Sequence, residues 1–222
     1  MGIPFLAYLA GGATIAPFFM GLCVYRRLER QIKPLFILFG IHAALTFVQA
    51  YLALRQTNNL WTSHVYYLVE VVILLRVYSL WTASAHARGI FYGMGILYSL
   101  FWAASKLLFE QFTTSALYTP TVSRIILLGS TLYILLMISS TTTRMLYSEP
   151  KFWFAAGFLV IFAGSLMFYG FRNLFLDLSV EAVKTLWSIH WSVTIVSNLL
   201  HVIGFLCILR FPNTGGQLEL AR

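Results

Sequence analysis

Charged residues are scarce in this sequence, and acidic ones are the scarcest. Asp, Glu, Lys and Arg make up 10% of its 222 residues, and only 7 residues are acidic. A soluble domain carries about 25% charged residues, so this composition excludes a protein whose whole surface faces water. Hydrophobic residues make up 59% of the chain, and the mean hydropathy is +0.80. The composition therefore predicts an integral membrane protein that forms one compact bundle.

Cysteine and lysine are missing where two familiar chemistries would need them. The 2 cysteines, Cys23 and Cys207, lie far apart and do not form the paired pattern of a cysteine zinc site. A retinal Schiff base needs a lysine in the middle of the last apolar run, and Lys184 lies at its edge instead. The net charge of +8 does not indicate a nucleic-acid partner, because most of the cations lie in short segments between apolar runs.

Long apolar runs predict the number of helices. A helix that crosses the hydrocarbon core of a bilayer needs about 20 apolar residues, and seven runs in this sequence reach that length. They span residues 3–24, 34–54, 61–82, 89–109, 120–142, 152–171 and 185–209. We therefore predict an all-α, seven-helix membrane bundle that forms a single domain over residues 1–222.

The distribution of Lys and Arg predicts the orientation of the bundle. Short cytoplasmic segments of membrane proteins carry more of these residues than external segments do. With the N-terminus outside, nine fall on the cytoplasmic side and three on the outer side. The nine are Arg26, Arg27, Arg30, Lys33, Arg88, Arg144, Lys151, Arg210 and Arg222, and the three are Arg55, Arg172 and Lys184. This bias predicts an external N-terminus and a cytoplasmic C-terminus.

Several polar side chains inside the apolar runs are candidates for a site. Ionisable groups in a membrane are costly and usually face the bundle interior or a cavity. His190 and His201 are eleven residues apart, which places them within about 20° of one helix face. His42 and Gln49 share a face of the second run, and Glu70 lies near the middle of the third. We expect a pocket between these three helices, with His42 and His201 in an inner layer, Gln49 and His190 in an outer layer, and Glu70 between them.

Other polar residues are expected at the rim of the bundle. Lys106 and Glu110 are one helical turn apart near the outer end of the fourth run, and Arg124 lies near the outer end of the fifth. We interpret these three as a peripheral ion-pair group. The segment around Asp177 and Glu181 is interpreted as a short amphipathic helix on the outer surface.

The candidate residues leave three functions open. A ligand-binding or sensory bundle would use the polar stripes as the lining of a pocket. A metal-dependent lipid hydrolase would draw zinc ligands from His42, Glu70, His190 and His201, and a b-type haem would use His42 with His201. Seven-helix hydrolases of the ceramidase and adiponectin-receptor superfamily resemble this chain in the helices that carry the site, but Leu38 stands where their second-helix motif has a serine.

Three patches resemble an uncharacterised family of small seven-helix membrane proteins of Bacteroidetes-type bacteria. The patches are "NNLWTSHVYYLVEVVILL", "KFWFAAGFLVIFAGSL" and "LWSIHWSVTIVSNLLHVIGF". The resemblance implies a multi-pass protein of the bacterial inner membrane with a sensory or accessory role. The candidate residues inside the patches include His64, Tyr67, Glu70, Trp187, His190 and Asn198.

The leading hypothesis is a non-catalytic, ligand-binding or sensory membrane protein. No cofactor is favoured, and zinc and haem b belong to the two alternatives. The expected partners are membrane lipid and a cytoplasmic or membrane signalling protein, with self-association left open.

Overall fold

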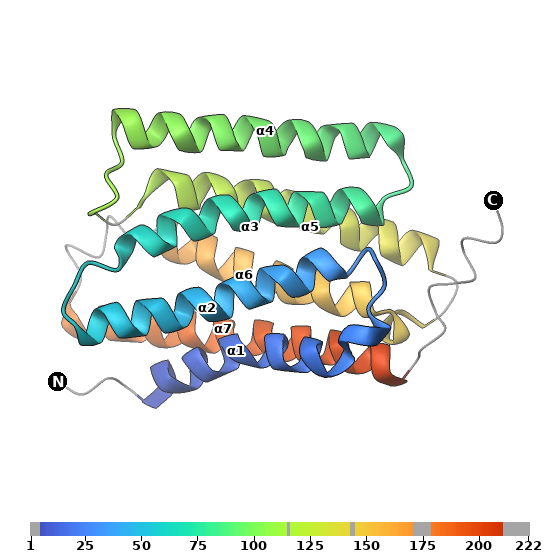
Figure 1. Cartoon of the computed structure of the whole chain (residues 1–222), viewed down its shortest axis with the longest axis horizontal. Coiled ribbons are helices and arrows are strands. Elements are labelled where there is room, and N and C mark those ends of the chain that lie inside the picture. The colour runs from blue at the N-terminus through green and yellow to red at the C-terminus, as the bar shows by residue number, and fades with distance from the viewer. Residues whose placement is uncertain (1–4, 115, 143–144, 171–178, 211–222) are drawn as a thin grey trace.

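The computed structural model describes residues 5–114, 116–142, 145–170 and 179–210. Within these ranges all regular structure is helical, and seven helices are long and apolar enough to cross a membrane. The predicted all-α fold with seven membrane-length helices is confirmed (Figure 1). The elements are α1 (Phe5–Val24), η1 (Tyr25–Arg27), α2 (Lys33–Leu54), α3 (Leu60–Trp81), α4 (Ala85–Leu108), α5 (Tyr118–Thr141), η2 (Leu146–Ser148), α6 (Pro150–Gly170) and α7 (Val180–Arg210).

Six of the long helices form a ring. Each helix packs against the next in the order α1, α2, α3, α5, α6 and α7, and α7 packs against α1 to close the ring. Helix α4 lies outside this ring, along the top edge of Figure 1, where it packs against α3 and, less extensively, α5. The interior of the ring therefore holds no helix and must be filled by side chains or left as a cavity.

Helix α4 begins four residues earlier than the sequence predicts. Ser84 precedes its first residue, Ala85, and the Ser84 hydroxyl accepts a hydrogen bond from the backbone N–H of Ala87. This N-cap satisfies one of the amide groups that a helix start leaves without an intrahelical partner. The polar segment that looks like a loop in the sequence is therefore the first turn of the helix.

Helix α7 also begins earlier than predicted, at Val180. The hydroxyl of Ser179 accepts a hydrogen bond from the backbone N–H of Ala182. Glu181 belongs to the first turn of α7, where its negative charge interacts favourably with the helix dipole. The predicted separate surface helix is therefore wrong at Glu181, and Asp177 lies outside the described residues.

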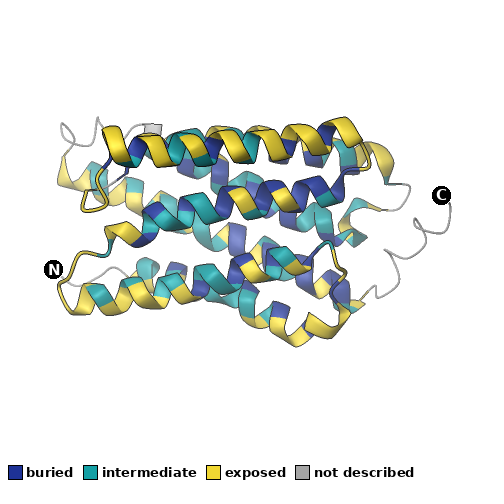
Figure 2. Ribbon diagram, turned by 45° about the horizontal axis from the view of Figure 1, so that its top comes forward, coloured by how far each residue is buried: buried dark blue, intermediate teal, exposed yellow. Residues whose placement is uncertain are grey.

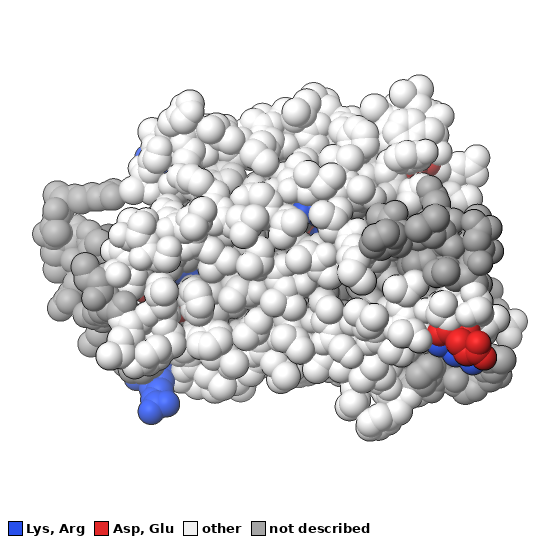
Figure 3. All heavy atoms as spheres, turned by 180° about the vertical axis from the view of Figure 1, so that it is seen from behind, with Lys and Arg blue, Asp and Glu red and all other residues white. Residues whose placement is uncertain are grey.

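The outer surface of the bundle is apolar. Figure 2 shows exposed positions along the outward faces of the helices and buried positions turned inward. Large apolar side chains such as Leu97, Leu107 and Leu136 are exposed. The face in Figure 3 carries few Lys, Arg, Asp or Glu atoms between its two ends. Such a surface suits contact with lipid, and it leaves the polar residues of the helices to the interior.

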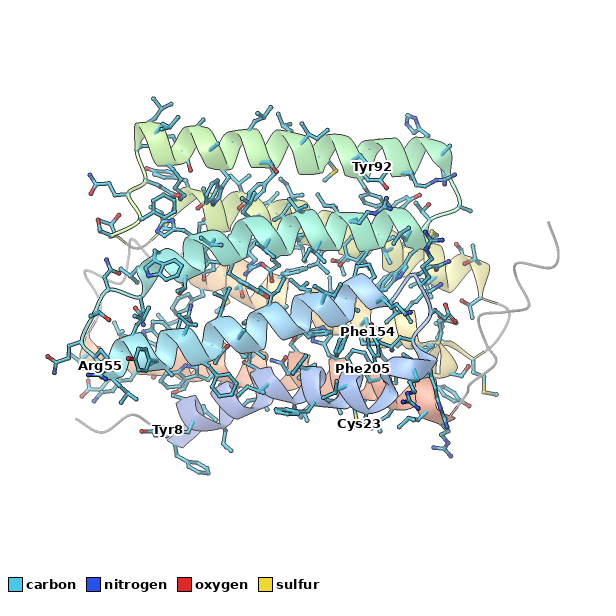
Figure 4. The ribbon with its side chains drawn as sticks, viewed as in Figure 1. Tyr8, Cys23, Arg55, Tyr92, Phe154 and Phe205 are labelled. Carbon is cyan, nitrogen blue, oxygen red and sulfur yellow. The ribbon has the colours of Figure 1, made fainter. Side chains whose placement is uncertain are left out.

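Four aromatic side chains close the interior near the start of α2 and α6 and the end of α7. Phe154 and Phe205 are fully buried with ring centroids 4.8 Å apart, and Figure 4 shows them side by side. Phe39 lies 5.8 Å from Phe205 and stacks on Phe158 at 6.1 Å. At Gly204 a Cβ atom would lie only 2.9 Å from the Phe154 ring, so close approach of α6 and α7 requires glycine here.

Candidate functional site

A cavity of about 480 Å³ lies inside the ring of helices. Each of the six ring helices contributes to its wall. On α2 the wall extends from Gln49 to Leu38, which is about 16 Å along the helix axis. On α7 it extends from Trp187 to His201, about 20 Å. The cavity is therefore long and narrow, and it reaches the aromatic cluster of Phe39, whose ring is part of its wall.

The structure brings eight of the nine predicted site residues to this cavity. They are His42, Gln49, Tyr67, Glu70, Trp187, His190, Asn198 and His201. The site is wider than the predicted three-helix pocket, because α1, α5 and α6 also line it. Their polar contributions are Thr14, Arg124, Ser165 and Tyr169.

An ion pair between Glu70 and Arg124 is the main polar feature of the wall. Arg124 Nη1 donates to Glu70 Oε2, and the two side chains are only 5–6% exposed. The guanidinium also lies over the rings of Tyr67 and Phe162, at 5.4 and 5.1 Å from their centroids. The prediction that Arg124 belongs to a peripheral group is wrong, because a buried carboxylate at this depth requires a counter-charge and Arg124 supplies it.

Glu70 also orders a chain of hydrogen bonds across to α2. The Tyr66 hydroxyl donates to Glu70 Oε1 at 3.2 Å, so its oxygen accepts from the Nδ1–H of His42, also at 3.2 Å. The His42 ring lies over the Tyr66 ring with centroids 4.4 Å apart. Because Nδ1 carries the proton, Nε2 of His42 carries the lone pair of the neutral imidazole. Charge on Glu70 thus selects the tautomer of His42.

His201 and His190 lie at opposite ends of the cavity against aromatic rings. His201 is 3% exposed, and its ring centroid lies 4.9 Å from that of Phe39 and 4.4 Å from that of Phe158. Both of its ring nitrogens are buried and neither makes a hydrogen bond of normal geometry, although the backbone carbonyl of Phe154 lies nearby. His190 stacks on Phe168 at 4.8 Å, and its Nδ1 is likewise buried and unpartnered. A buried polar atom in this state costs about 1–3 kcal/mol.

Further polar side chains tie the ring helices to one another around the cavity. Gln49 Nε2 donates to Thr62 Oγ1 at 2.8 Å, which links α2 to α3. The hydroxyls of Tyr67 and Tyr169 share a hydrogen bond of 2.6 Å, which links α3 to α6. Asn198 Nδ2 donates to a backbone carbonyl of its own helix at 2.8 Å. The wall is therefore held in place by its own polar groups.

His64 is the predicted site residue that the structure places elsewhere. It is fully buried between α3 and the segment after α4. Its Nε2–H donates to the carbonyl of Thr114 at 2.8 Å, and its Nδ1 accepts from Lys106 Nζ at 2.7 Å. Lys106 also forms the predicted ion pair with Glu110, at 2.6 Å. Both ring nitrogens are satisfied, so this cluster holds helices together and leaves His64 no free group for a ligand.

Glu110 connects this cluster to the start of α5. Its Oε1 accepts hydrogen bonds from the backbone N–H groups of Leu117, Tyr118 and Thr119. Burial would raise the pKa of this carboxyl, but hydrogen bonds from Lys106, from Thr119 and from the backbone outweigh burial and lower the pKa to about 2. Glu110 is therefore an ionised cap at a helix N-terminus, which is a stabilising position for a carboxylate.

The residues present do not fit the two metal alternatives. In the described part of the chain no three of His, Cys, Asp and Glu come close enough to hold a metal ion. His190 and His201 lie about 16 Å apart along α7, and Glu70 is already paired with Arg124. For a haem, His201 would have to present a ring nitrogen to open space, whereas both of its nitrogens are buried and Nε2 packs against Gly157 of α6.

No protein-family model, curated protein or solved structure matches this chain. The resemblance of the three sequence patches to a bacterial seven-helix family therefore stays a prediction. What can be said of function comes from the geometry of the cavity and from the chemistry of its wall.

Proposed function

We propose that this protein binds a small membrane-soluble molecule in the cavity between its helices and has a sensory or other non-catalytic role. The observation that carries the proposal is the cavity of about 480 Å³ that eight predicted polar residues share. Ligand sites are typically cavities of about 300–1,000 Å³ with largely apolar walls and a few converging polar groups. The wall described above has this composition.

The unpartnered histidine nitrogens also favour a ligand. Protein interiors are packed closely, and a bundle that needed only stability would fill this volume with apolar side chains. Instead His190 and His201 line it, and each has a buried ring nitrogen that makes no hydrogen bond of normal geometry. A ligand that reorients these rings and supplies hydrogen bonds would offset their cost.

We further propose that the N-terminus is external and that the protein resides in the bacterial inner membrane. The ratio of nine cytoplasmic to three external Lys and Arg residues supports this orientation. In that orientation the aromatic cluster of Phe39, Phe154, Phe158 and Phe205 lies on the cytoplasmic side of the cavity. Ligand binding would then be transmitted through the inner ends of α6 and α7 to a partner protein or a second copy of the chain.

A cavity-filling variant tests the proposal. Thr194 lines the cavity, and its hydroxyl donates only to a backbone carbonyl of its own helix. Thr194→Phe therefore fills space in the cavity without removing a hydrogen bond to another helix. Ser192 forms the same kind of bond on the exposed face of α7, which makes Ser192→Phe the matched control. Each protein is purified in lipid nanodiscs, extracted with organic solvent and analysed by mass spectrometry.

We expect a stoichiometric small molecule in the wild type and in Ser192→Phe, and a loss of about tenfold or more in Thr194→Phe. Equal amounts in all three proteins, or none in any, would contradict the proposal. An absorption spectrum and metal analysis of the same samples test the alternatives. A Soret band would indicate haem, and stoichiometric zinc that disappears in Glu70→Ala or His42→Ala would indicate a hydrolase.

A further inference from the structure

We infer that the cavity takes an uncharged, chain-like amphiphile with a hydroxyl group, and that this hydroxyl donates a hydrogen bond to Nε2 of His42. The inference rests on the proposed function, because it names the chemical class of the ligand for the same cavity. Three properties of the wall carry it: its charge, its shape and the direction of its hydrogen bonds.

The charge of the wall favours an uncharged ligand. Among the described residues that line the cavity, the charged ones are Glu70 and Arg124. They neutralise each other in a direct ion pair. A carboxylate, phosphate or ammonium group would enter this apolar interior without a counter-charge, which is strongly unfavourable. Arg124 Nε is buried without a hydrogen-bond partner and can still donate to an uncharged oxygen. A second carboxylate there would lie beside that of Glu70, which is unfavourable.

The shape of the cavity favours a slender molecule. Its volume of about 480 Å³ extends along about 16–20 Å of α2 and α7, so the cavity is longer than it is wide. Apolar side chains line it at several levels, including Leu45, Leu60, Ile161 and Phe158. A hydrocarbon chain with a compact polar head matches both the width and the apolar lining better than a globular polar solute does.

The hydrogen-bond chain from Glu70 to His42 favours a head group that donates. The Tyr66 hydroxyl donates a hydrogen bond to Glu70, and the Nδ1–H of His42 donates one to Tyr66. Nε2 of His42 is thus left as an acceptor, and it forms no hydrogen bond with any residue that the structure describes. The negative charge at the far end of this chain polarises it and strengthens the acceptor. A hydroxyl satisfies Nε2, whereas an ether or a ketone does not.

Three matched probes test the inference: dodecylphenol, its methyl ether dodecylanisole, and dodecylbenzoate. Binding is measured as equilibrium partition into nanodiscs that contain the protein, corrected for partition into empty nanodiscs. In the wild type we expect the phenol to bind about tenfold more tightly than the ether and the benzoate, since one buried hydrogen bond and one uncompensated charge separate them.

Variants of the acceptor chain distinguish a direct hydrogen bond from simple packing. His42→Phe keeps a ring over Tyr66 but removes the acceptor, and the preference for phenol over ether should fall below about twofold. His86→Phe replaces an exposed histidine on α4 and should keep the preference. Tyr66→Phe retains His42 but no longer holds its proton on Nδ1, and it should reduce the preference for phenol over ether by about threefold or more. This variant replaces His42→Phe as the test if His42→Phe does not fold.

Equal binding of phenol and ether to the wild type, or tighter binding of the benzoate, would overturn the inference and leave the proposed function standing. The same holds if the preference survives in both His42→Phe and Tyr66→Phe. If no probe binds and solvent extraction yields no small molecule, the proposed function fails together with the inference.

Discussion

Removing one charge of the Glu70–Arg124 pair should destabilise the protein strongly. Both side chains are 5–6% exposed, and each is the counter-charge of the other. Glu70→Gln or Arg124→Gln leaves one charge buried and uncompensated, which costs about 3–5 kcal/mol. For a chain of this length about 1 kcal/mol shifts Tm by roughly 2–4 °C, so each single variant should lose roughly 6–20 °C. The double variant removes both charges and should lose clearly less than the sum.

The two cysteines provide the assay. Cys207 is buried, whereas Cys23 is exposed, so a thiol-reactive fluorogenic dye reports unfolding through Cys207 in a Cys23→Ser background. The matched control is Arg76→Gln. Arg76 lies on α3 like Glu70, but it is exposed and rests over the ring of Tyr92, 5.3 Å from its centroid. Its loss should shift Tm by no more than about 2 °C.

Two results would refute this reasoning. If each single variant shifts Tm no more than Arg76→Gln does, the pair is not desolvated. If the double variant loses the full sum of the two single losses, the charges are not coupled, because coupled neighbours depart from additivity by about 0.5–3 kcal/mol.

Two further predictions concern packing and capping. A Cβ atom at Gly157 would lie 2.5 Å from the His201 ring, so Gly157→Ala should lower the free energy of unfolding by about 1–3 kcal/mol, measured by thermal unfolding. The control is Gly129→Ala, where a Cβ would have no atom within 4 Å, and it should be neutral or slightly stabilising. Because the pKa of Glu110 is lowered to about 2 in the folded protein, its contribution to stability is complete above pH 4.5 and is lost as the pH falls toward 2. Glu110→Gln should therefore be less stable at neutral pH and should lose less stability across that acid range.

The number and order of the helices could be predicted from the sequence because a membrane imposes a minimum apolar length. The starts of most helices agree with the prediction within two residues, but those of α4 and α7 do not. The first turn of each of these two helices holds a charged residue and is capped by a single serine. Ser84 and Ser179 act as caps in the structure, but a serine in a short segment that also holds a charged residue fits a loop equally well.

Part of the cavity wall could be predicted because helical periodicity places His190 with His201, and His42 with Gln49, on common faces. The position of Arg124 could not be predicted, because depth along a helix does not tell which way its side chain faces. The signal that points to Arg124 is Glu70 itself, a carboxylate near the middle of the third run that requires a counter-charge. His64 shares the third helix with Glu70, yet it faces Lys106 on α4 and not the ring interior.

The buried ion pair makes more sense as an orienting device than as a source of stability. Replacing such a pair by well-packed apolar residues is often neutral or even stabilising, so a bundle does not need Glu70 and Arg124 to fold. What only an ionised carboxylate can do here is accept from Tyr66 and from Arg124 at once, without donating in return. That one-way direction fixes the proton of His42 on Nδ1 and leaves Nε2 as an acceptor. In the double variant Gln at position 70 can donate as well as accept, so the chain loses its direction. A double variant that is nearly as stable as the wild type but has lost its preference for the phenol would separate these two roles.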